Sequence, residues 1–578
     1  MTTLASGTDT LTRDALTVLQ PGFPGTTAPD WLLRRLGEGL ASVGLFGRNI
    51  ASPEQLSSLT AQLRSERDDV LVAIDEEGGD VTRLEARTGS SFPGNHALGA
   101  VDDVDLTRAV AHELGRRLAA CGVNLNWAPS ADVNSNPSNP VIGVRSFGAD
   151  PELVARHTAA YVTGLQSAGV AACTKHFPGH GDTAVDSHHA LPRIDAESTV
   201  LEHRELLPFR AAIAAGSRAV MSAHILVPTL DPDRPATLSL RILTDLLRGE
   251  LAYDGLIVTD GMEMQAIAAT YGIERGSVLA IAAGADAICV GGGLADDETV
   301  RRLRDALVGA VRSGDLPEDR LAEAAERVRG LARWTASGAA GAGGFAGVSG
   351  SAPGGTFDEA RNSVSSRAGS VAGPRSAREP NPAAQAGSRS EAGSAAGTRP
   401  ASAPVLASQA TSDGTSPAAD TSPPAPREVT RVDIGLVAAR RALTVTGADD
   451  FTPLTEPPYV ALLTPVANIA VGDETPWGVA AELARLLPGT ETAGFAGEDA
   501  GGVVLKAAGT RRIVVVVRDE HRHPWMADAL DTLLAARPDT VVVEMGVPQA
   551  PPRGALHIAT HGAARVCGHA AAEVIAGA

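Results

Sequence analysis

Lysine is nearly absent from this chain. Among its 49 lysine and arginine residues only Lys175 and Lys506 are lysines, in a total of 578 residues. Arginine therefore serves in almost every other place where the protein carries a cation. Because lysine offers a compact point charge that arginine does not, we expect Lys175, which lies beside histidines in KHFPGH, to have a specific task.

Cysteine is scarce as well. The four cysteines lie far apart in the sequence, and three of them are in or beside apolar runs. No two of them form a CxxC pair. Such residues behave as small buried hydrophobic side chains, so we expect free thiols in a reducing compartment rather than a disulfide framework.

Positive net charge and long apolar runs are also missing. The formal net charge is −19, which argues against nucleic acid or an anionic membrane surface as a partner. No apolar stretch approaches the length of a membrane span. The segment MTTLASGTDTLTRDALTVLQPGF has neither a basic start nor a continuous apolar region, so it does not resemble a secretion signal. We therefore expect a cytoplasmic protein.

The length of the chain predicts two globular domains, since one core does not usually serve so many residues. From residue 334 to residue 426 the sequence consists largely of Gly, Ala, Ser, Pro and Thr, with almost no aliphatic periodicity. Such a segment buries too little apolar surface to offset the entropy of ordering, so we expect a disordered linker. The linker separates a domain at 1–333 from a domain at 427–578.

Eight short apolar runs recur in the first domain, with helical patterns between most of them. They lie at 16–20, 42–46, 70–74, 123–127, 170–174, 219–223, 256–259 and 285–290. Apolar strands that alternate with helices indicate a parallel sheet covered on both faces. Eight such units favour a (β/α)8 barrel, with an open doubly wound sheet as the alternative.

The C-terminal domain repeats this alternation on a smaller scale and predicts an open α/β sandwich. Strands are expected at 459–463, 512–517, 540–544 and 556–559, and helices at 477–487, 524–536 and 563–575. We find no charged cluster of catalytic type in this part of the sequence.

Polar residues follow five consecutive strands of the predicted barrel. They are Asp75-Glu76-Glu77 with Arg83, then Asp132-Val133-Asn134 leading to Arg145, then Lys175-His176, Ser222-Ala223-His224 and Thr259-Asp260-Gly261. Because barrel active sites form at the C-terminal ends of the strands, we expect these groups to meet at one face. Their charge-assisted hydrogen bonds suit the recognition of several sugar hydroxyls at once.

Two of these segments also contain the groups that glycosidic bond cleavage requires. Asp260 ends an apolar strand, so its carboxylate would be partly desolvated and aimed into the cleft, as a nucleophile toward an anomeric carbon must be. Asp186 and His188 are two residues apart in an extended loop and project to the same side. Asp186 can then hold one imidazole nitrogen while the other transfers a proton near neutral pH.

The histidine cluster could instead bind zinc. His176 and His180 have a suggestive spacing, but Phe177-Pro178-Gly179 between them rules out a regular helix, and no cysteine lies near. Loops with clustered histidines do bind zinc in some proteins, so this alternative stays open. His180 and His189 are interpreted as structural residues or as neighbours of the substrate.

The residues at the strand ends also have structural interpretations. Asp260 could be the N-cap of the following helix. Asp75 could form a turn, an alternative that is more credible for Glu76 and Glu77. Arg145 could pair with a carboxylate on the surface. A cap alone would not explain charged groups after four other strands, so we favour Asp260 as the nucleophile.

At these residues the chain resembles glycoside hydrolase family 3, and within it the bacterial beta-N-acetylglucosaminidase branch. The motifs are KHFPGHG with DSH downstream, DEEGG followed by an arginine, IGVRSFG and VTDGMEM. The resemblance extends from residue 16 to about residue 331, and the C-terminal domain resembles the second α/β domain of the family more weakly.

The resemblance implies a role for each of these residues. Asp260 would be the nucleophile and His188 the general acid/base, with Asp186 as its partner. The N-acetylglucosamine ring in the −1 subsite would be bound by Asp75, Arg83, Arg145, Lys175 and His176. The resemblance implies neither a metal nor an organic cofactor.

The expected activity is that of a retaining beta-N-acetylglucosaminidase acting on small soluble glycans, either muropeptides or chitin oligosaccharides. A phosphorylase that uses the same residues is one alternative, and a sugar-binding barrel without catalytic activity is another. The oligomeric state stays open.

The sequence departs from the family pattern at a few positions. Asp80 stands where an arginine or a small apolar residue is expected, and Gly261 follows the proposed nucleophile where a bulkier residue is common. The linker is also longer than usual in the family. Glu263 is interpreted as an exposed residue on a helix face and is assigned no role.

Overall fold

The computed structural model describes residues 2–187, 190–293, 296–337, 433–465 and 475–578. They form a barrel and a smaller α/β domain, which are described separately below.

The barrel contains eight parallel strands in chain order. Six of them form one sheet: β2 (Ser42–Leu45), β3 (Leu71–Ile74), β4 (Leu125–Asn126), β5 (Ala171–Phe177), β6 (Ala219–Ser222) and β7 (Leu256–Thr259). The other two, β1 (Leu19–Pro21) and β8 (Ile288–Val290), pair with each other. A bridge between Val258 and Ala287 joins β7 to β8, and the Ser42 hydroxyl donates to the Leu19 carbonyl at 3.1 Å between β2 and β1. The strands thus form a closed ring, which confirms the predicted (β/α)8 barrel.

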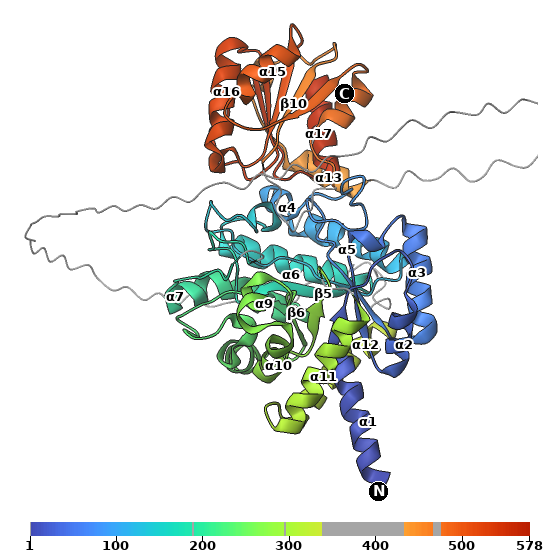
Figure 1. Cartoon of the computed structure of the whole chain (residues 1–578). Helices are drawn as coiled ribbons and strands as arrows, with labels where there is room; N and C mark the ends of the chain where they lie inside the picture. The colour runs from blue at the N-terminus through green and yellow to red at the C-terminus, as the bar shows by residue number, and fades with distance from the viewer. Residues whose placement is uncertain (1, 188–189, 294–295, 338–432, 466–474) are drawn as a thin grey trace, which may run out of the picture. The chain divides into compact units, whose positions relative to one another are not determined.

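Helices follow the strands and surround the barrel (Figure 1). They are α1 (Thr2–Thr17), α2 (Asp30–Glu38), α3 (Pro53–Glu66), α4 (Asn95–Val101), α5 (Val104–Ala120), α6 (Pro151–Ser167), α7 (Ser198–Val200), α8 (Leu206–Ala214), α9 (Gln265–Tyr271), α10 (Ile273–Ala283), α11 (Asp297–Ser313) and α12 (Glu318–Ala336). Four of them begin after side chains that accept a hydrogen bond from a backbone N–H of the first turn, namely Ser52, Asp103, Asp150 and Asp296. Such N-caps satisfy donors that have no partner within the helix.

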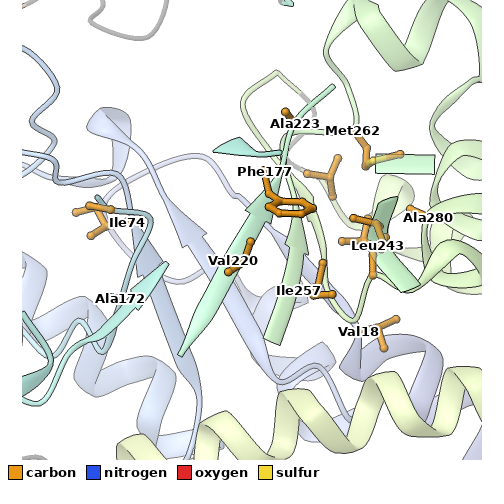
Figure 2. Close-up of a cluster of buried hydrophobic side chains, with 14 of the residues drawn as sticks. Val18, Ile74, Ala172, Phe177, Val220, Ala223, Leu243, Ile257, Met262 and Ala280 are labelled. Atoms are coloured by element: carbon orange, nitrogen blue, oxygen red, sulfur yellow. The ribbon is translucent and has the colours of Figure 1, made fainter. Parts of the chain in front are cut away.

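The strands are buried along their whole length, and most of their residues are apolar because both faces are covered. Side chains on one face belong to the large core that the strands share with the surrounding helices, and Figure 2 shows ten labelled residues of this core. Side chains on the other face fill the inside of the barrel, among them Ala73, Cys173, Met221 and Val258. Leu331 of α12 belongs to the same inner cluster, so this helix covers the end of the barrel where the strands begin.

The first predicted strand begins too early. Leu16 lies in α1, and β1 starts only at Leu19. Leu11, Ala15 and Leu16 are buried on one side of α1, so the start of the apolar run at 16–20 belongs to a helix face rather than to a strand.

The C-terminal domain has one six-stranded sheet. Its order is β11 (Glu491–Phe495), β10 (Tyr459–Leu463), β12 (Ile513–Val517), β13 (Val541–Glu544), β14 (Leu556–Ala559) and β9 (Thr444–Thr446). Only β9 is antiparallel to its neighbour. The helices are α13 (Ile434–Ala442), α14 (Ala480–Leu486), α15 (Ala500–Ala508), α16 (Pro524–Ala536) and α17 (Arg565–Ala576), and two apolar clusters cover the two faces of the sheet.

The four strands and three helices predicted in this domain are present. The edge strands β9 and β11 were not predicted, because their side chains are mostly exposed and they contain no continuous apolar run. Helices α13 and α15 were not predicted either.

Helix α12 extends to Ala336 and so includes the first three residues of the linker predicted to start at 334. The remainder of the predicted linker, apart from residue 337, lies outside the described residues. In the parts of the chain that the structure describes, no helix has the length and apolar character needed to cross a membrane.

Candidate active site

A cavity of about 490 Å³ lies at the C-terminal ends of the barrel strands. Six of the residues predicted for the site line it: Asp75, Arg83, Arg145, Lys175, His176 and Asp260. Apolar side chains contribute part of the wall, among them Phe46, Trp127 and Met221. The barrel therefore brings together predicted site residues that are up to 185 residues apart in sequence, from Asp75 to Asp260.

Lys175 is held between two carboxylates at the end of β5. Its Nζ atom lies 2.6 Å from Asp75 Oδ1 and 2.7 Å from Glu77 Oε1, and its side chain is only 3% exposed. Burial by itself would lower the pKa of Lys175, but the charges of Asp75 and Glu77 outweigh it and raise that pKa. The ammonium therefore stays charged and fixed in direction at the wall of the cavity.

Arg145 forms a bidentate ion pair with Glu77. The distances are 3.0 Å from Nε to Oε2 and 2.7 Å from Nη2 to Oε1, and both side chains are buried. Burial would raise the pKa of Glu77, but Arg145 and Lys175 hold it well below the ordinary value. The carboxylate that pairs with Arg145 is thus buried in the site, and the alternative of a surface partner is wrong.

Asp132 orients His176. Its Oδ2 atom lies 2.7 Å from His176 Nδ1, and its Oδ1 atom accepts hydrogen bonds from the backbone N–H groups of His176 and His180. Burial would raise the pKa of Asp132, but the two histidines and these hydrogen bonds keep it well below the ordinary value. The His176 ring is therefore fixed, with its Nε2 atom 3.4 Å from Arg145 Nη2.

His180 lies beside His176 but is more deeply buried. Their rings are in edge contact, with centroids 5.9 Å apart. Burial and the neighbouring His176 lower the pKa of His180 to about 4, so its imidazole is neutral at neutral pH. Among the described residues, no three metal-binding side chains converge, so the geometry gives the zinc alternative no support there.

Asp260 follows β7 directly, and its partly exposed side chain lines the cavity. Its backbone N–H donates to the Ser222 carbonyl at the end of β6, and its Oδ1 atom accepts from the Gly261 N–H at 2.8 Å. Helix α9 begins only at Gln265, with Met264 in the N-cap position. The alternative that Asp260 is a helix cap is therefore wrong.

Arg83 and Glu76 belong to the turn after β3. Arg83 Nη2 lies 3.9 Å from Asp75 Oδ2 at the cavity. Glu76 is buried and accepts hydrogen bonds from the backbone N–H groups of Arg83 and Leu84, each at 2.8 Å. Glu76 thus shapes the turn, as the structural interpretation predicted, while the neighbouring Glu77 lines the cavity.

The predicted acid/base pair is only partly within the described residues. Asp186 is described and half-buried, and Ser187 lines the cavity. His188 and His189 lie outside the described residues. The start of the same loop is tethered, because Arg204 Nη2 contacts Asp182 Oδ2 at 2.6 Å and Arg204 Nε contacts Glu205 Oε1 at 2.7 Å.

A family model described as "Glycosyl hydrolase family 3 N terminal domain" matches residues 30–331. The chain belongs to glycosyl hydrolase family 3. It is thus a glycoside hydrolase, and its relatives place it in the bacterial beta-hexosaminidase branch of family 3.

Three relatives illustrate this similarity. "Beta-hexosaminidase A" of Pseudoalteromonas piscicida is 36% identical over 312 residues, which are 50% of this chain and 52% of that protein. "Beta-hexosaminidase" of Alkalilimnicola ehrlichii is 40% identical over 257 residues, which are 43% of this chain and 73% of that protein. The solved structure of a family 3 beta-N-acetylglucosaminidase from Paenibacillus sp. str. FPU-7 has a TM-score of 0.75 and 32% identity, and the match covers 98% of this chain and 96% of that one.

Three residues of this family 3 hydrolase were missed or misread in the sequence. Glu77 was interpreted as a turn residue, and Asp132 was noted only as part of a polar run after a strand. Both are polar residues at strand ends, and this position is the signal that could have marked them as site residues. Glu263 was expected on an exposed helix face, but it lies before α9 and lines the cavity.

Proposed function

We propose that this protein is a retaining beta-N-acetylglucosaminidase that removes terminal beta-linked N-acetylglucosamine from small soluble glycans. The observation that carries the proposal is that Asp260 lines the same cavity as the ion pair Lys175–Asp75 and the buried ion pair Arg145–Glu77. A carboxylate and a fixed set of donors and acceptors then meet at one sugar-sized space. The names of the relatives support the choice of sugar.

The reaction begins with a sugar ring held by the fixed polar groups. The ring hydroxyls can form hydrogen bonds with the side chains of Lys175, Arg145, Arg83 and His176. The carboxylate of Asp75 accepts hydrogen bonds from the same hydroxyls. Because ion pairs already fix these side chains, little reorganisation accompanies binding. The anomeric carbon is thereby placed next to the Asp260 carboxylate.

Bond cleavage proceeds in two displacements. Asp260 attacks the anomeric carbon, while His188, held by Asp186, gives a proton to the departing oxygen. The resulting glycosyl-enzyme is attacked by water, from which His188 takes the proton, and the bond to Asp260 breaks. Two inversions at the anomeric carbon give net retention.

The test is turnover of an aryl N-acetyl-beta-glucosaminide compared with the matching aryl beta-glucoside, each with and without phosphate. We expect cleavage of the first substrate only, with free N-acetylglucosamine released initially as the beta anomer and with no dependence on phosphate. Glycosyl phosphate as the product would identify the protein as a phosphorylase instead. Tight binding of N-acetylglucosamine without any turnover would identify it as a sugar-binding barrel without catalytic activity.

The natural substrates that we propose are muropeptides or chitin oligosaccharides. Both present a terminal beta-linked N-acetylglucosamine on a soluble chain. Incubation with each class, followed by mass spectrometry of the products, identifies the class that loses one terminal sugar per turnover.

A further inference from the structure

The loop that follows β8 forms a glycine wall of the cavity. We define this wall as Gly291–Gly293, of which Gly292 and Gly293 line the cavity together with Asp260. Gly291 has a φ of 148°, and a Cβ atom there would lie 2.2 Å from the Gly22 backbone nitrogen. Gly291 is therefore packed closely against the end of β1, and no larger residue fits at this position.

The carboxylate of Glu263 holds the amides of this wall. Glu263 Oε1 accepts hydrogen bonds from the backbone N–H groups of Gly291 at 2.9 Å, Gly292, and Gly293 at 3.4 Å. Hydrogen bonds from backbone amides to an ionised carboxylate are about twice as strong as those between neutral groups. The other oxygen, Oε2, is buried and has no hydrogen-bond partner among the described residues.

Arg48, in the short 3-10 turn that follows β2, holds the carbonyls of the same wall. Its Nη1 atom donates to the Gly292 carbonyl at 3.0 Å, its Nη2 atom to the Gly291 carbonyl, and its Nε atom to the Phe23 carbonyl at 3.1 Å. Its guanidinium also lies over the ring of Phe46, 4.4 Å from the centroid, and Phe46 lines the cavity. The glycine wall is thus fixed by an anion at its amides and by a cation at its carbonyls.

Glu263 also lies in the same loop as the proposed nucleophile. It follows Asp260 by three residues, and a Cβ atom at Gly261 would lie 3.4 Å from Glu263 Oε2. The Glu263 side chain therefore connects the loop after β7 to the loop after β8, next to the position where the anomeric carbon would lie.

We propose that Glu263 is a positioning residue that fixes the glycine wall against the bound sugar. The proposal rests on the proposed glycosidase function. Three consecutive glycines have more conformational freedom than any other tripeptide. Without the carboxylate, binding of the substrate would have to order the wall, and this cost would weaken binding more than it slows the chemical steps.

The kinetic test compares Glu263→Ala and Glu263→Gln with wild type on an aryl N-acetyl-beta-glucosaminide. Glu298→Ala, an exposed position on α11, is the matched control. We expect Glu263→Ala to raise KM about fivefold or more while kcat stays within about threefold of wild type. Glu263→Gln keeps one acceptor oxygen, so its KM should lie in between, and Glu298→Ala should resemble wild type. An unchanged KM in Glu263→Ala would overturn the proposal.

Hydrogen–deuterium exchange of the peptide that contains Gly291–Gly293 tests the same contact without substrate. Faster exchange is expected in Glu263→Ala, and in Arg48→Ala if the first variant does not fold. Exchange at the wild-type rate would overturn the proposal even if the wild-type protein showed no glycosidase activity. Absence of wild-type turnover together with faster exchange in the variant would overturn the proposed function alone.

Discussion

At the scale of single residues, burial decides what Lys175 and its neighbours can do. The Lys175 ammonium and the Glu77 carboxylate are each 3% exposed, so each group is costly to bury without the other. The pairs Lys175–Asp75 and Arg145–Glu77 remove this cost and leave a set of charges that cannot rotate away from the cavity. A site built in this way recognises a polar ring by its geometry, since its donors and acceptors are fixed before the ring arrives.

The nucleophile assignment predicts a large loss of activity in Asp260→Ala. Without the carboxylate no glycosyl-enzyme can form, so kcat should fall roughly 10⁴-fold or more. The measurement is steady-state turnover of an aryl N-acetyl-beta-glucosaminide, with circular dichroism to verify the fold. Activity within a factor of ten of wild type would exclude Asp260 as the nucleophile.

The acid/base assignment predicts that the effect of His188→Ala depends on the leaving group. A good leaving group needs little protonation, so the loss in the first displacement should be small for activated aryl glycosides and large for an alkyl glycoside or a disaccharide. The measurement is kcat/KM for a series of leaving groups of different pKa. Equal losses across the series would remove the assignment.

The buried His180 predicts a dependence of stability on pH. An unfolded histidine takes up a proton near pH 6.5, whereas the pKa of His180 in the folded protein is about 4. This contribution to folding is therefore complete above pH 6.5 and is lost as the pH falls from 6.5 to 4. Linkage gives a loss of about 2 kcal/mol between pH 7 and pH 5.

Urea unfolding at pH 7 and pH 5 measures this loss. The glutamine in His180→Gln does not titrate in this range. The free energy of unfolding of the variant should therefore fall between pH 7 and pH 5 by about 2 kcal/mol less than that of wild type. An identical pH dependence in wild type and variant would show that the pKa of His180 is not lowered by folding.

At the scale of single elements, the loop after β5 depends on a close approach of backbones. A Cβ atom at Gly181 would lie 1.6 Å from the Val133 carbonyl oxygen, in the loop that follows β4. The amide of Asn139 donates to the carbonyls of His180 and Gly181, which ties the two loops together at the same point. The path of the chain toward Asp186 is therefore set by contact with a neighbouring loop.

This contact predicts that Gly181→Ala is harmful although alanine is small. The loop must move by at least an ångström, and a displacement of that size at catalytic groups costs about 100-fold in kcat/KM. Gly309→Ala on α11 is the control, because its Cβ atom would meet nothing within 4 Å. That substitution should raise the free energy of unfolding by roughly 1 kcal/mol and leave activity unchanged. Full activity of Gly181→Ala would show that the loop tolerates the shift.

At the scale of the whole molecule, the proposed catalytic and binding residues all belong to the barrel. The relative from Alkalilimnicola ehrlichii aligns with 43% of this chain, yet the alignment covers 73% of that relative. That relative is therefore a shorter protein than this chain. We propose residues 427–578 as a separate second domain and residues 334–426 as the connection.

A chain truncated after residue 337 is accordingly expected to keep its activity. Its kcat/KM for an aryl N-acetyl-beta-glucosaminide should lie within about tenfold of that of the full chain, because no proposed catalytic group is removed. Thermal unfolding verifies that the shortened protein is folded. A folded but inactive barrel would show that the second domain completes the site.

The strands and the polar residues at their ends could be predicted from the amino-acid sequence. Apolar runs of strand length and the turn residues around them are local signals, so seven of the eight barrel strands were located well. The remaining strand, β1, was misplaced only where a helix face continued into a strand. The placement of Asp75, Lys175 and Asp260 at one face follows from the rule that parallel strands of a barrel end on the same side.

Which of these polar residues meet depends on the folded barrel and could not be predicted. Glu77 and Arg145 are 68 residues apart, and Asp132 and His176 are 44 apart, so no local pattern distinguishes these partners from solvated side chains. The same holds for Glu263, whose partners lie 28 to 30 residues further along the chain. Periodicity reports which face of an element is buried, whereas the pairing of charges depends on the closure of the barrel, which brings distant strand ends within hydrogen-bond distance.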